Sequence, residues 1–199
     1  MIDLPNSPSC ERNKEVILQE LQNHFSISKN VLEIGGGTGQ HAHHFASSMP
    51  HLRWQTTDRN SYLKNLAARV QYAALDNLPE PLELDVNQPW TGSKPLFDTV
   101  YSANTLHIMG WKEVVFMLSW LPTILAPKAR LAFYGPFNYG GNFTSESNKN
   151  FDSSLKKNPG EMGIRDFESL EVLMHQQEFS LFQDCEMPAN NRLLIWDRG

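Results

Sequence analysis

The sequence is poor in cysteine and in concentrated positive charge. Its two cysteines, Cys10 and Cys185, are too few for a disulfide framework, so we expect both thiols to stay reduced. No basic run is longer than the Lys156-Lys157 pair, and 22 acidic against 17 basic residues give a net charge of -5. The chain therefore lacks the basic patch that binds a nucleic-acid backbone. We expect a small or uncharged substrate and no nucleic-acid partner.

Long apolar runs are also missing. No segment is long and apolar enough to span a bilayer, and residues 1–6 do not combine a basic start with an apolar core. We therefore expect no membrane association and a cytoplasmic location. The 199 residues, 40% of them hydrophobic and 11% aromatic, are sufficient for one compact core. The expectation is a single domain over residues 1–199, with an N-terminal helix region at 1–28.

The most informative segment runs from Val31 to Gly39 and reads VLEIGGGTG. Residues that favour β-strands lead into glycines at 35, 36, 37 and 39, and an amphipathic helical pattern follows at once. Glycine lets the backbone turn sharply and lets a ligand approach main-chain atoms. The start of the following helix leaves N–H groups free. The segment therefore predicts a strand–loop–helix unit that binds a cofactor.

The glycine spacing and the neighbouring acids bear on which cofactor binds. A dinucleotide fingerprint, G-x-G-x-x-G, would need its third glycine at position 40, where this chain has Gln40. Glu33 stands two residues before Gly35, and Asp58 ends the next predicted strand. Carboxylates favour a cation and repel a pyrophosphate. A nicotinamide-dependent (NAD) oxidoreductase is therefore the less favoured interpretation.

The pattern Glu33-x-Gly35-x-Gly37-x-Gly39 resembles the first motif of class I S-adenosylmethionine (SAM)-dependent methyltransferases. This resemblance implies a Rossmann-like α/β sandwich with a seven-stranded sheet of order 3-2-1-4-5-7-6, the last strand antiparallel. It also implies SAM as cofactor and S-adenosylhomocysteine (SAH) as product. By the same resemblance, Glu33 and the loop hold the methionine end, Asp58 the ribose, and Asp85-Val86 the adenine. The predicted cofactor-binding residues are Glu33, Gly35, Gly36, Gly37, Gly39, Gln40, Asp58, Asp85, Val86 and Asn104.

The whole chain is also similar to a narrower family: small bacterial proteins known as a domain of unknown function, with a methyltransferase-like relative in animals. The stretches that carry this similarity are Glu11-Arg12-Asn13-Lys14, Gly37-Thr38-Gly39-Gln40-His41, Ala103-Asn104-Thr105-Leu106-His107-Ile108, Tyr134-Gly135-Pro136-Phe137 with Gly140-Gly141, Gly163-Ile164-Arg165-Asp166 and Met187-Pro188-Ala189-Asn190-Asn191. The chain departs from that family at Val16, where proline is common, and at Ala126-Pro127-Lys128-Ala129, where a Pro-Gly-Gly turn is common. The similarity implies a cofactor and leaves the acceptor open.

The candidate catalytic residues follow the fourth and fifth predicted strands. His107 comes after the fourth strand, where an acceptor is expected to approach the methyl group, and histidine titrates near neutrality. It is therefore the candidate general base for a hydroxyl or thiol acceptor. Asn104 can orient the acceptor or contact the cofactor, and Tyr134 can donate a hydrogen bond to the acceptor. The alternatives are structural, since His107 can pack beside its loop and Asp58 can cap the helix near Asn60.

Polar residues near the two ends of the chain are candidates for substrate binding. Arg12 and Asn13 lie near the start, and Asn190 and Asn191 occupy a predicted hairpin turn. We place all four at the mouth of the pocket. The alternatives are a solvated face for Arg12 and ordinary turn chemistry for the two asparagines.

Three histidines, His41, His43 and His44, raise the question of a metal site. On a helix His41 and His44 share a face, but His43 lies about 100° or more from both. No cysteine or carboxylate stands nearby at ligand spacing. We therefore predict no metal site.

Hydrophobic periodicity predicts alternating strands and helices until an antiparallel hairpin ends the chain. The expected strands cover residues 31–34, 52–57, 82–86, 96–103, 130–134, 179–186 and 192–196. The expected helices cover residues 11–25, 42–49, 63–70, 111–125, 147–156 and 165–177. Pro122 predicts a bend or an early stop in the fourth helix. The Gly-, Asn- and Ser-rich insertion at 137–164 predicts a lid over the acceptor, with Gly140-Gly141 as its hinge.

Two functions of different class fit these residues best. The first is a SAM-dependent methyltransferase that acts on a small-molecule acceptor. The second is a protein that binds SAM or SAH without transferring a methyl group. In that case the glycine loop and Asp58 would hold the cofactor, while Asn104 and His107 would be structural only.

Overall fold

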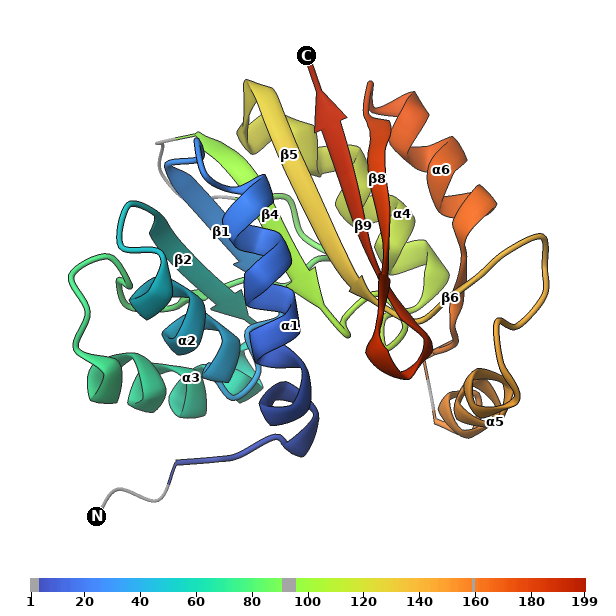
Figure 1. Cartoon of the computed structure of the whole chain (residues 1–199), viewed down its shortest axis with the longest axis horizontal. Helices are drawn as coiled ribbons and strands as arrows, with labels where there is room; N and C mark the ends of the chain where they lie inside the picture. The colour runs from blue at the N-terminus through green and yellow to red at the C-terminus, as the bar shows by residue number, and fades with distance from the viewer. Residues whose placement is uncertain (1–3, 91–95, 159) are drawn as a thin grey trace. The chain divides into compact units, whose positions relative to one another are not determined.

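The computed structural model describes residues 4–90, 96–158 and 160–199 (Figure 1). Its contacts divide the chain into two compact units. The described part of the first unit comprises residues 4–85 and 96–101. That of the second comprises residues 86–90, 102–158 and 160–199. The first unit contains the glycine loop, and the second contains the candidate catalytic residues.

The first unit alternates helices with parallel strands. Its elements are α1 (Pro8–His24), β1 (Asn30–Ile34), α2 (Gln40–Ser48), β2 (Arg53–Asp58), α3 (Asn60–Ala73), β3 (Leu82–Glu83) and most of β4 (Phe97–Ala103). Strand β1 pairs in parallel with β2 and with β4, and β2 pairs in parallel with β3. Because the carboxyl ends of parallel strands share one edge of a sheet, the segments after these strands leave the unit at the same edge.

Aromatic rings from three elements form the centre of this unit. Phe45 of α2, Trp54 of β2 and Tyr101 of β4 are fully buried, and each pair of ring centroids is 5.5 Å apart. Such ring pairs add specific geometry to the burial of large apolar surfaces. The cluster therefore fixes α2 on the sheet and with it the loop that precedes α2.

The second unit consists of antiparallel strands and the helices that pack with them. Its elements are α4 (Trp111–Trp120), the 3-10 turn η1 (Leu121–Ile124), β5 (Leu125–Gly135), β6 (Phe137–Asn138), α5 (Glu146–Leu155), β7 (Arg165–Asp166), α6 (Phe167–Gln176), β8 (Ser180–Met187), the 3-10 turn η2 (Pro188–Asn190) and β9 (Asn191–Arg198). Strand β9 is antiparallel to both β5 and β8, so the predicted C-terminal hairpin is confirmed.

The main sheet has seven strands in the order β3-β2-β1-β4-β5-β9-β8, and β6 and β7 form a separate pair. Counted along the main sheet alone, this is the predicted order 3-2-1-4-5-7-6. The last strand of the chain, β9, is antiparallel to β5. The predicted class I methyltransferase fold is therefore confirmed.

The predicted third strand is shorter than its sequence pattern. It was expected over 82–86, but β3 covers only Leu82–Glu83. The next N–H group, that of Leu84, donates to the carbonyl of Asp58 at 2.9 Å. The carbonyl of Val86 accepts a hydrogen bond from Trp120 Nε1 at 3.1 Å. Because β2 itself ends at Asp58, the run after Leu84 has no further residue of β2 to pair with, and the chain turns at residues 86–87.

Helix α4 stops early, as the proline in its sequence predicts. It ends at Trp120, and the 3-10 turn η1 follows with Pro122 in its first turn. Proline has no N–H to donate, so the α-helical ladder cannot pass through it. Neither α4 nor any other helix in the described residues is long and apolar enough to cross a membrane.

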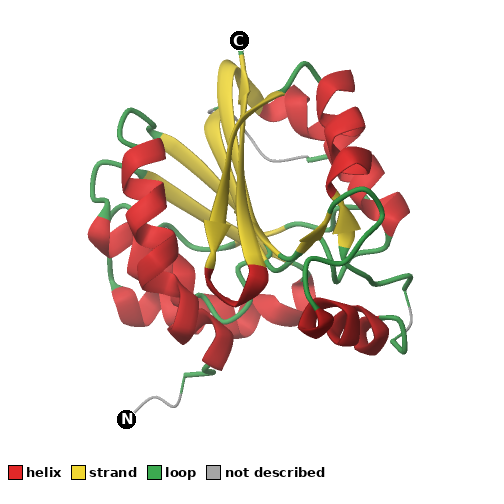
Figure 2. Ribbon diagram, turned by 45° about the vertical axis from the view of Figure 1, so that its right-hand side comes forward, coloured by secondary structure: helices red, strands yellow, loops and turns green. Residues whose placement is uncertain are grey.

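The insertion at 137–164 is closed at its base by the short parallel pair β6–β7, which Figure 2 shows beside the main sheet. The expected hinge residues, Gly140 and Gly141, both have positive φ. Their N–H groups donate to Glu168 Oε2 at 2.9 Å and to Asp166 Oδ2 at 2.8 Å. The base of the insertion is therefore anchored to the start of α6, and α5 lies beyond this anchor.

Candidate functional site

The loop between β1 and α2 is held by hydrogen bonds to the end of β2. The N–H groups of Gly35 and Gly36 donate to the carbonyl of Thr57 at 3.1 and 2.9 Å. The N–H of Gly37 donates to Asp58 Oδ2 at 2.7 Å. Gly37 has a φ of 56°, a conformation that favours glycine. The predicted strand–loop–helix unit is confirmed. Its loop lies against Asp58, the residue predicted to bind the ribose.

Two neighbouring glycines have opposite surroundings. A Cβ atom on Gly36 would lie 2.2 Å from Thr56 Oγ1, whereas a Cβ atom on Gly37 would meet no atom within 4 Å. Gly36 is therefore required by the packing of the loop. Gly37 borders open space beside an acidic side chain, and an added side chain would fill that space. This is a feature of a loop that admits a ligand to its main chain.

Two alanine variants should separate these roles. Gly36→Ala should lower the free energy of unfolding by about 1–3 kcal/mol, because the new methyl group collides with Thr56. Gly37→Ala should cost only about 1 kcal/mol for its left-handed backbone. Its methyl group should nevertheless weaken binding of the expected cofactor by roughly tenfold or more, since it occupies the open space. Urea unfolding and calorimetric titration measure the two effects, and equal affinity in Gly37→Ala and the wild type would contradict the assignment.

Asp58 lies at the end of β2, as predicted, and its carboxylate accepts two backbone hydrogen bonds. Oδ2 accepts from Gly37 N–H and Oδ1 from Arg59 N–H, both at 2.7 Å. Burial raises the pKa of Asp58, while these two hydrogen bonds and the charge of Arg59 oppose the rise. The N-cap of α3 is Arg59, and that helix start has no side-chain cap. The carboxylate of Asp58 is therefore directed to the glycine loop.

Glu33 is a buried carboxylate in the strand before the loop. Its residue is 2% exposed, and its Oε2 accepts a hydrogen bond from Trp54 Nε1 at 3.1 Å. Burial raises the pKa of Glu33 to about 7, the side chains of Thr56 and Trp54 oppose this rise, and the charge of Asp58 adds to it. Among the described residues, no lysine, arginine or histidine forms an ion pair with Glu33. A bound cation would therefore stabilise its ionised form.

The predicted adenine segment, Asp85-Val86, starts beside the backbone of Asp58. Leu84, directly before it, donates its N–H to the Asp58 carbonyl. Asp85 ends the first unit, and Val86 opens the second, where it is 8% exposed. The adenine-binding role of the two residues stays a prediction.

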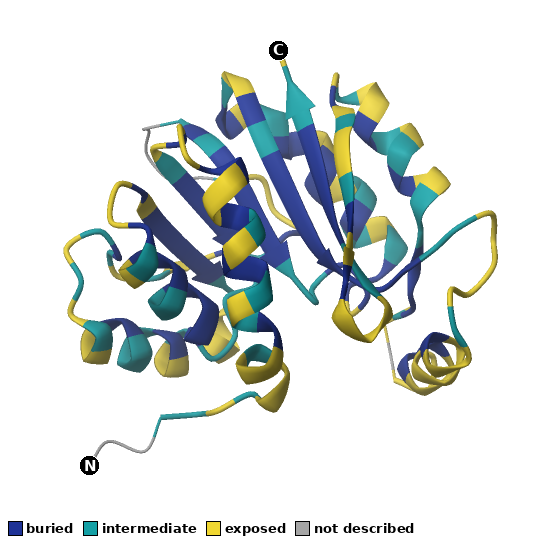
Figure 3. Cartoon of the chain, viewed as in Figure 1, coloured by how far each residue is buried: buried dark blue, intermediate teal, exposed yellow. Residues whose placement is uncertain are grey.

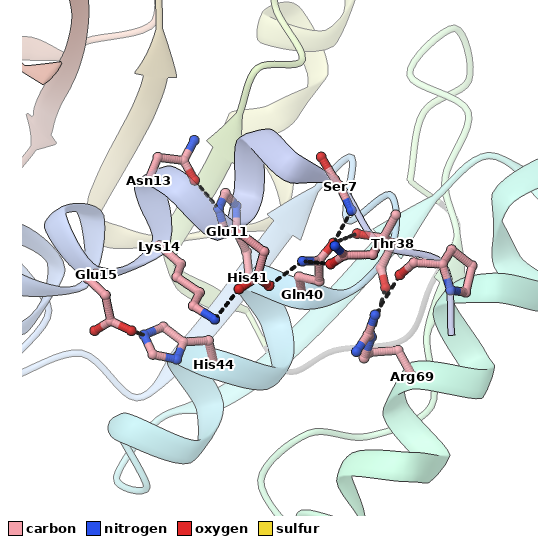
Figure 4. Close-up of polar contacts among 12 residues, drawn as sticks. Ser7, Glu11, Asn13, Lys14, Glu15, Thr38, Gln40, His41, His44 and Arg69 are labelled. Carbon is pink, nitrogen blue, oxygen red and sulfur yellow. Dashed lines mark hydrogen bonds and ion pairs between the residues drawn. The ribbon is translucent and has the colours of Figure 1, made fainter. Parts of the chain in front are cut away.

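Gln40, a predicted cofactor residue, has its side-chain amide fully engaged by the protein (Figure 4). Its Oε1 accepts hydrogen bonds from the N–H of Ser7 at 2.5 Å and from Thr38 Oγ1 at 2.9 Å. Its Nε2 donates to Asn6 Oδ1 at 2.6 Å and to Glu11 Oε1 at 2.5 Å. The side chain thus joins the N-terminal segment to the glycine loop, and the backbone of Gln40 is the part left for a cofactor.

Arg69 of α3 joins the same two segments. Its Nη2 donates to the carbonyl of Pro5 at 2.6 Å, and its Nε donates to the carbonyl of Thr38 at 3.3 Å. A Cβ atom on Gly39 would lie 2.8 Å from the Cγ of Arg69. The guanidinium of Arg69 therefore donates to two carbonyl groups of the protein. An arginine that binds a phosphate would instead direct these N–H groups at the phosphate oxygens.

The two predicted substrate residues of α1 differ in exposure. Arg12 is exposed, whereas Asn13 is 8% exposed and lies with its Oδ1 2.8 Å from His41 Nε2 (Figure 4). The other ring nitrogen of His41 lies 3.3 Å from the hydroxyl of Tyr101. Burial lowers the pKa of His41 to about 4, so the ring is neutral at pH 7. The structure thus places Asn13 in a buried polar contact between α1 and α2.

The histidines of α2 do not converge on one point. Both ring nitrogens of His41 have partners within the protein. The ring of His43 is edge-on to Tyr72 with centroids 6.1 Å apart, and His44 Nε2 lies 3.3 Å from Glu15 Oε1. Before all three rings could coordinate one metal ion, each would have to break its present contact with the protein.

In the second unit, Asn104 and His107 converge on Gly135. A Cβ atom on Gly135 would lie 3.5 Å from His107 Nδ1 and 3.8 Å from Asn104 Oδ1. Asn104 has a φ of 56°, which is uncommon for a residue with a side chain, and its N–H donates to the Tyr134 carbonyl at 2.8 Å. The bare glycine therefore leaves space beside two of the predicted catalytic side chains. Tyr134, the third, is 4% exposed, and its carbonyl holds Asn104.

His107 is a buried histidine that is neutral at pH 7. It is 6% exposed, and the ring of Phe151 is edge-on to it with centroids 5.3 Å apart. Burial lowers the pKa of His107 to about 4, and the charge of Arg165 adds to this effect. Because buried histidines with a shifted pKa are common at functional sites, this ring beside Asn104 and Gly135 is a candidate for contact with a ligand.

Sequence reasoning assigned no role to the residues that hold the His107 turn. Arg165 Nε donates to the Leu106 carbonyl at 2.9 Å, and its Nη2 donates to the Met109 carbonyl. The N–H of Gly163 donates to the carbonyl of His107 itself at 2.9 Å. In the sequence, the stretch Gly163-Ile164-Arg165-Asp166 indicates only a similarity to a family and no structural role. Phe151 was missed as well, because nothing in a sequence shows which ring will cover a distant histidine.

The two predicted substrate asparagines of the hairpin turn contact protein groups. Asn190 Nδ2 donates to Ser147 Oγ at 3.2 Å, and Asn191 Nδ2 donates to the Pro188 carbonyl at 3.0 Å. The first contact reaches α5, and the second stays within the turn. The structure therefore connects the turn to the lid helix, and substrate binding by these residues stays a prediction.

A sequence profile of one protein family matches residues 4–198. The chain belongs to the family described as protein of unknown function (DUF938). The match includes the glycine loop, the strand ends that carry the acids and the turn with His107.

Several solved methyltransferases have a similar fold. The methyltransferase SibL in its apo form has a TM-score of 0.78 at 20% identity, over 96% of this chain and 55% of that chain. Mitomycin 7-O-methyltransferase MmcR has a TM-score of 0.75 at 20% identity, over 92% of this chain and 54% of that chain. Human N-acetylserotonin methyltransferase in complex with SAM has a TM-score of 0.80 at 15% identity, over 96% of this chain and 53% of that chain. The chain spans about half the length of these proteins, and identities this low establish the fold alone.

Proposed function

We propose that the protein is a SAM-dependent methyltransferase that acts on a small-molecule acceptor. The observation that carries this proposal is the open space at Gly37, next to Asp58 and preceded in β1 by the buried carboxylate of Glu33. A cationic nucleoside without phosphate suits such a loop, whereas a pyrophosphate would be repelled. The similarity in fold to solved SAM-dependent methyltransferases supports the same reading.

Each acid in the first unit has a distinct proposed role. Asp58 keeps lone pairs beyond its bonds to Gly37 and Arg59, so it can accept hydrogen bonds from ribose hydroxyls. Glu33 supplies negative charge toward the methionine end, and Asp85 with Val86 borders the adenine. When bound, SAM would supply a methyl group already activated by its sulfonium.

The second unit supplies the acceptor side in this proposal. Asn104 orients the acceptor, and His107 accepts the proton that a hydroxyl or thiol must lose. The ring of Phe151, which is itself 41% exposed, lies edge-on to the imidazole on its α5 side. The chain's contribution to the rate is then alignment and removal of one proton.

Calorimetric titration with SAM, SAH and NAD side by side tests the cofactor. SAM and SAH should bind, and NAD should not. Asp58→Ala should weaken SAM binding by roughly a hundredfold, because it removes a charged acceptor of two ribose hydrogen bonds. Asp76→Ala, at an exposed position of the same unit, is the matched control and should bind like the wild type. The proposal fails if NAD binds in preference to SAM, or if Asp58→Ala retains wild-type affinity.

Methyl transfer itself separates an enzyme from a binding protein. SAM labelled in its methyl group is incubated with the protein and a small-molecule fraction of a cell extract. Label should appear in an extractable small molecule and should depend on His107. Tight SAM binding without transfer would favour the non-catalytic alternative.

A further inference from the structure

Helix α5 is attached to the hairpin turn η2 by asparagine side chains. Asn148 Nδ2 donates to the carbonyl of Asn190 at 3.0 Å and to Thr144 Oγ1 at 2.9 Å. In return, Asn190 Nδ2 donates to Ser147 Oγ at 3.2 Å. Asn148 is 5% exposed, so its amide is a buried group that these partners satisfy.

The turn itself is shaped to present the carbonyl of Asn190. Ala189 and Asn190 both have positive φ, 58° and 57°, and Asn191 Nδ2 donates back to the Pro188 carbonyl. Two successive left-handed residues are costly, and asparagine tolerates this conformation better than most residues. The turn is therefore a defined docking point for α5.

A second attachment lies one helical turn further along α5. Asp152, 3% exposed, accepts a hydrogen bond from the N–H of Ile164 at 2.9 Å through Oδ1. The adjacent N–H, that of Gly163, donates to the carbonyl of His107. The same short segment thus holds both α5 and the turn that carries His107.

Phe151 lies on the same face of α5 as these two polar anchors. Asn148, Phe151, Asp152 and Leu155 are spaced i, i+3, i+4 and i+7, the spacing of one helical face. Figure 3 shows dark-blue buried residues on part of α5 and yellow exposed residues on the rest. A docking face with two polar anchors buries less apolar area than a core helix, so it can open at lower cost.

We propose that Asn148 and Asn190 form a latch that holds α5 closed over His107, and that opening of this latch admits the methyl acceptor. In this role they are positioning residues, which act on His107 through α5 and Phe151. The second part of the statement rests on the proposed methyltransferase function. The first part concerns the protein alone and can be tested without an acceptor.

Variants of Asn148 test the latch. Asn148→Ala removes the donor, and Asn148→Asp keeps the shape but replaces the N–H donors with an acceptor. Loss of these hydrogen bonds should raise amide exchange in residues 146–155 and the rate of His107 modification by diethyl pyrocarbonate about tenfold. The matched control is Asn150→Ala, because Asn150 is an exposed asparagine of the same helix. It should match the wild type in both measurements.

Phe151→Ala is the second reference, since it uncovers His107 without touching the latch. It should raise the rate of His107 modification and leave exchange in α5 near the wild-type rate. NMR titration should show the pKa of His107 rising toward its ordinary value in the Asn148 variants, because opening restores solvent to the ring. A purely structural role for Asn148 would not move that pKa.

Two results would overturn the proposal. One is that Asn148→Ala behaves like Asn150→Ala in both measurements. The other is that Phe151→Ala leaves His107 modification unchanged, because α5 would then not cover the ring. Calorimetric titration with SAM keeps this test separate from that of the function, since neither Asn148 nor Asn190 is among the predicted cofactor-binding residues. If the wild type fails to bind SAM, the proposed function fails while the exchange and modification results still decide the latch.

Discussion

Replacing Glu33 with glutamine is expected to stabilise the ligand-free protein at pH 8 by about 3 kcal/mol. Burial raises the pKa of Glu33 from 4.5 to about 7 in the folded chain. Between these two values the folded state holds a proton that the unfolded state has lost, so stability falls as pH rises through this window. Above pH 7 the carboxylate is ionised and buried, and no cationic side chain among residues 4–90, 96–158 and 160–199 forms an ion pair with it. Glutamine has a similar shape, can still accept the hydrogen bond from Trp54, and carries no charge.

The measurement compares the two proteins at each pH by urea unfolding. At pH 4 they should have nearly equal stability, and most of the difference should develop between pH 4.5 and pH 7. The two proteins must be compared at the same pH, because His41 and His107 change the free energy of unfolding with pH in the opposite direction to Glu33. Their folded-state pKa values are lowered to about 4, so they reduce stability as pH falls below 6.5. Glu15→Gln, at a side chain that is 63% exposed, controls for the change in net charge and should show little effect. A constant difference between Glu33→Gln and the wild type would refute the assignment.

The same substitution should weaken SAM binding if Glu33 supplies charge to the methionine end. The wild type should then bind SAM more tightly as pH rises from 6 to 8, because the cation favours the ionised carboxylate. Glu33→Gln should lose both the affinity and its dependence on pH. A variant that is more stable and binds less would show that the buried charge is kept for the ligand. A variant that is more stable and binds equally would place Glu33 outside the cofactor site.

The sheet could be predicted because local patterns and a family motif agreed. The glycines after β1 and the proline in η1 each stop an element for a local reason, and both boundaries follow from single residues. The third strand was predicted too long, because its partner β2 ends at Asp58 and the Leu84 N–H takes the last carbonyl of that strand. Sequence periodicity reports burial, and it cannot show where the neighbouring strand ends.

The residues of the candidate site at strand ends could be predicted from the sequence. Those whose role depends on tertiary contacts could not. Asp58 could be placed because an acid at the end of the second strand has a topological meaning. The sequence predicted that Gln40 binds the cofactor and that Asn13 binds the substrate. In the folded chain the Gln40 side chain is hydrogen-bonded to Glu11, and that of Asn13 to His41. Such contacts join residues that are 28 or 29 positions apart, so no local pattern could reveal them.

Replacing His107 with alanine is expected to lower methyl transfer by about 10²–10⁴-fold, the usual contribution of a positioned general base. SAM affinity should stay unchanged, because His107 is not one of the predicted cofactor residues. Most of those residues belong to the first unit, and only Val86 and Asn104 belong to the second with His107. Labelled methyl transfer and calorimetric titration measure the two effects. His175→Ala, at an α6 side chain that is 57% exposed, is the control and should keep full activity.

The pH dependence of transfer distinguishes a base from a packing residue. Because the pKa of His107 is lowered to about 4, the ring is already neutral at pH 6. The wild-type rate should therefore stay flat from pH 8 down to pH 6 and fall only as pH approaches 4, where the imidazole is protonated. An ordinary solvated histidine base would lose activity near pH 6.5. If His107→Ala transfers methyl groups at the wild-type rate, the ring beside Asn104 and Gly135 has only a packing role.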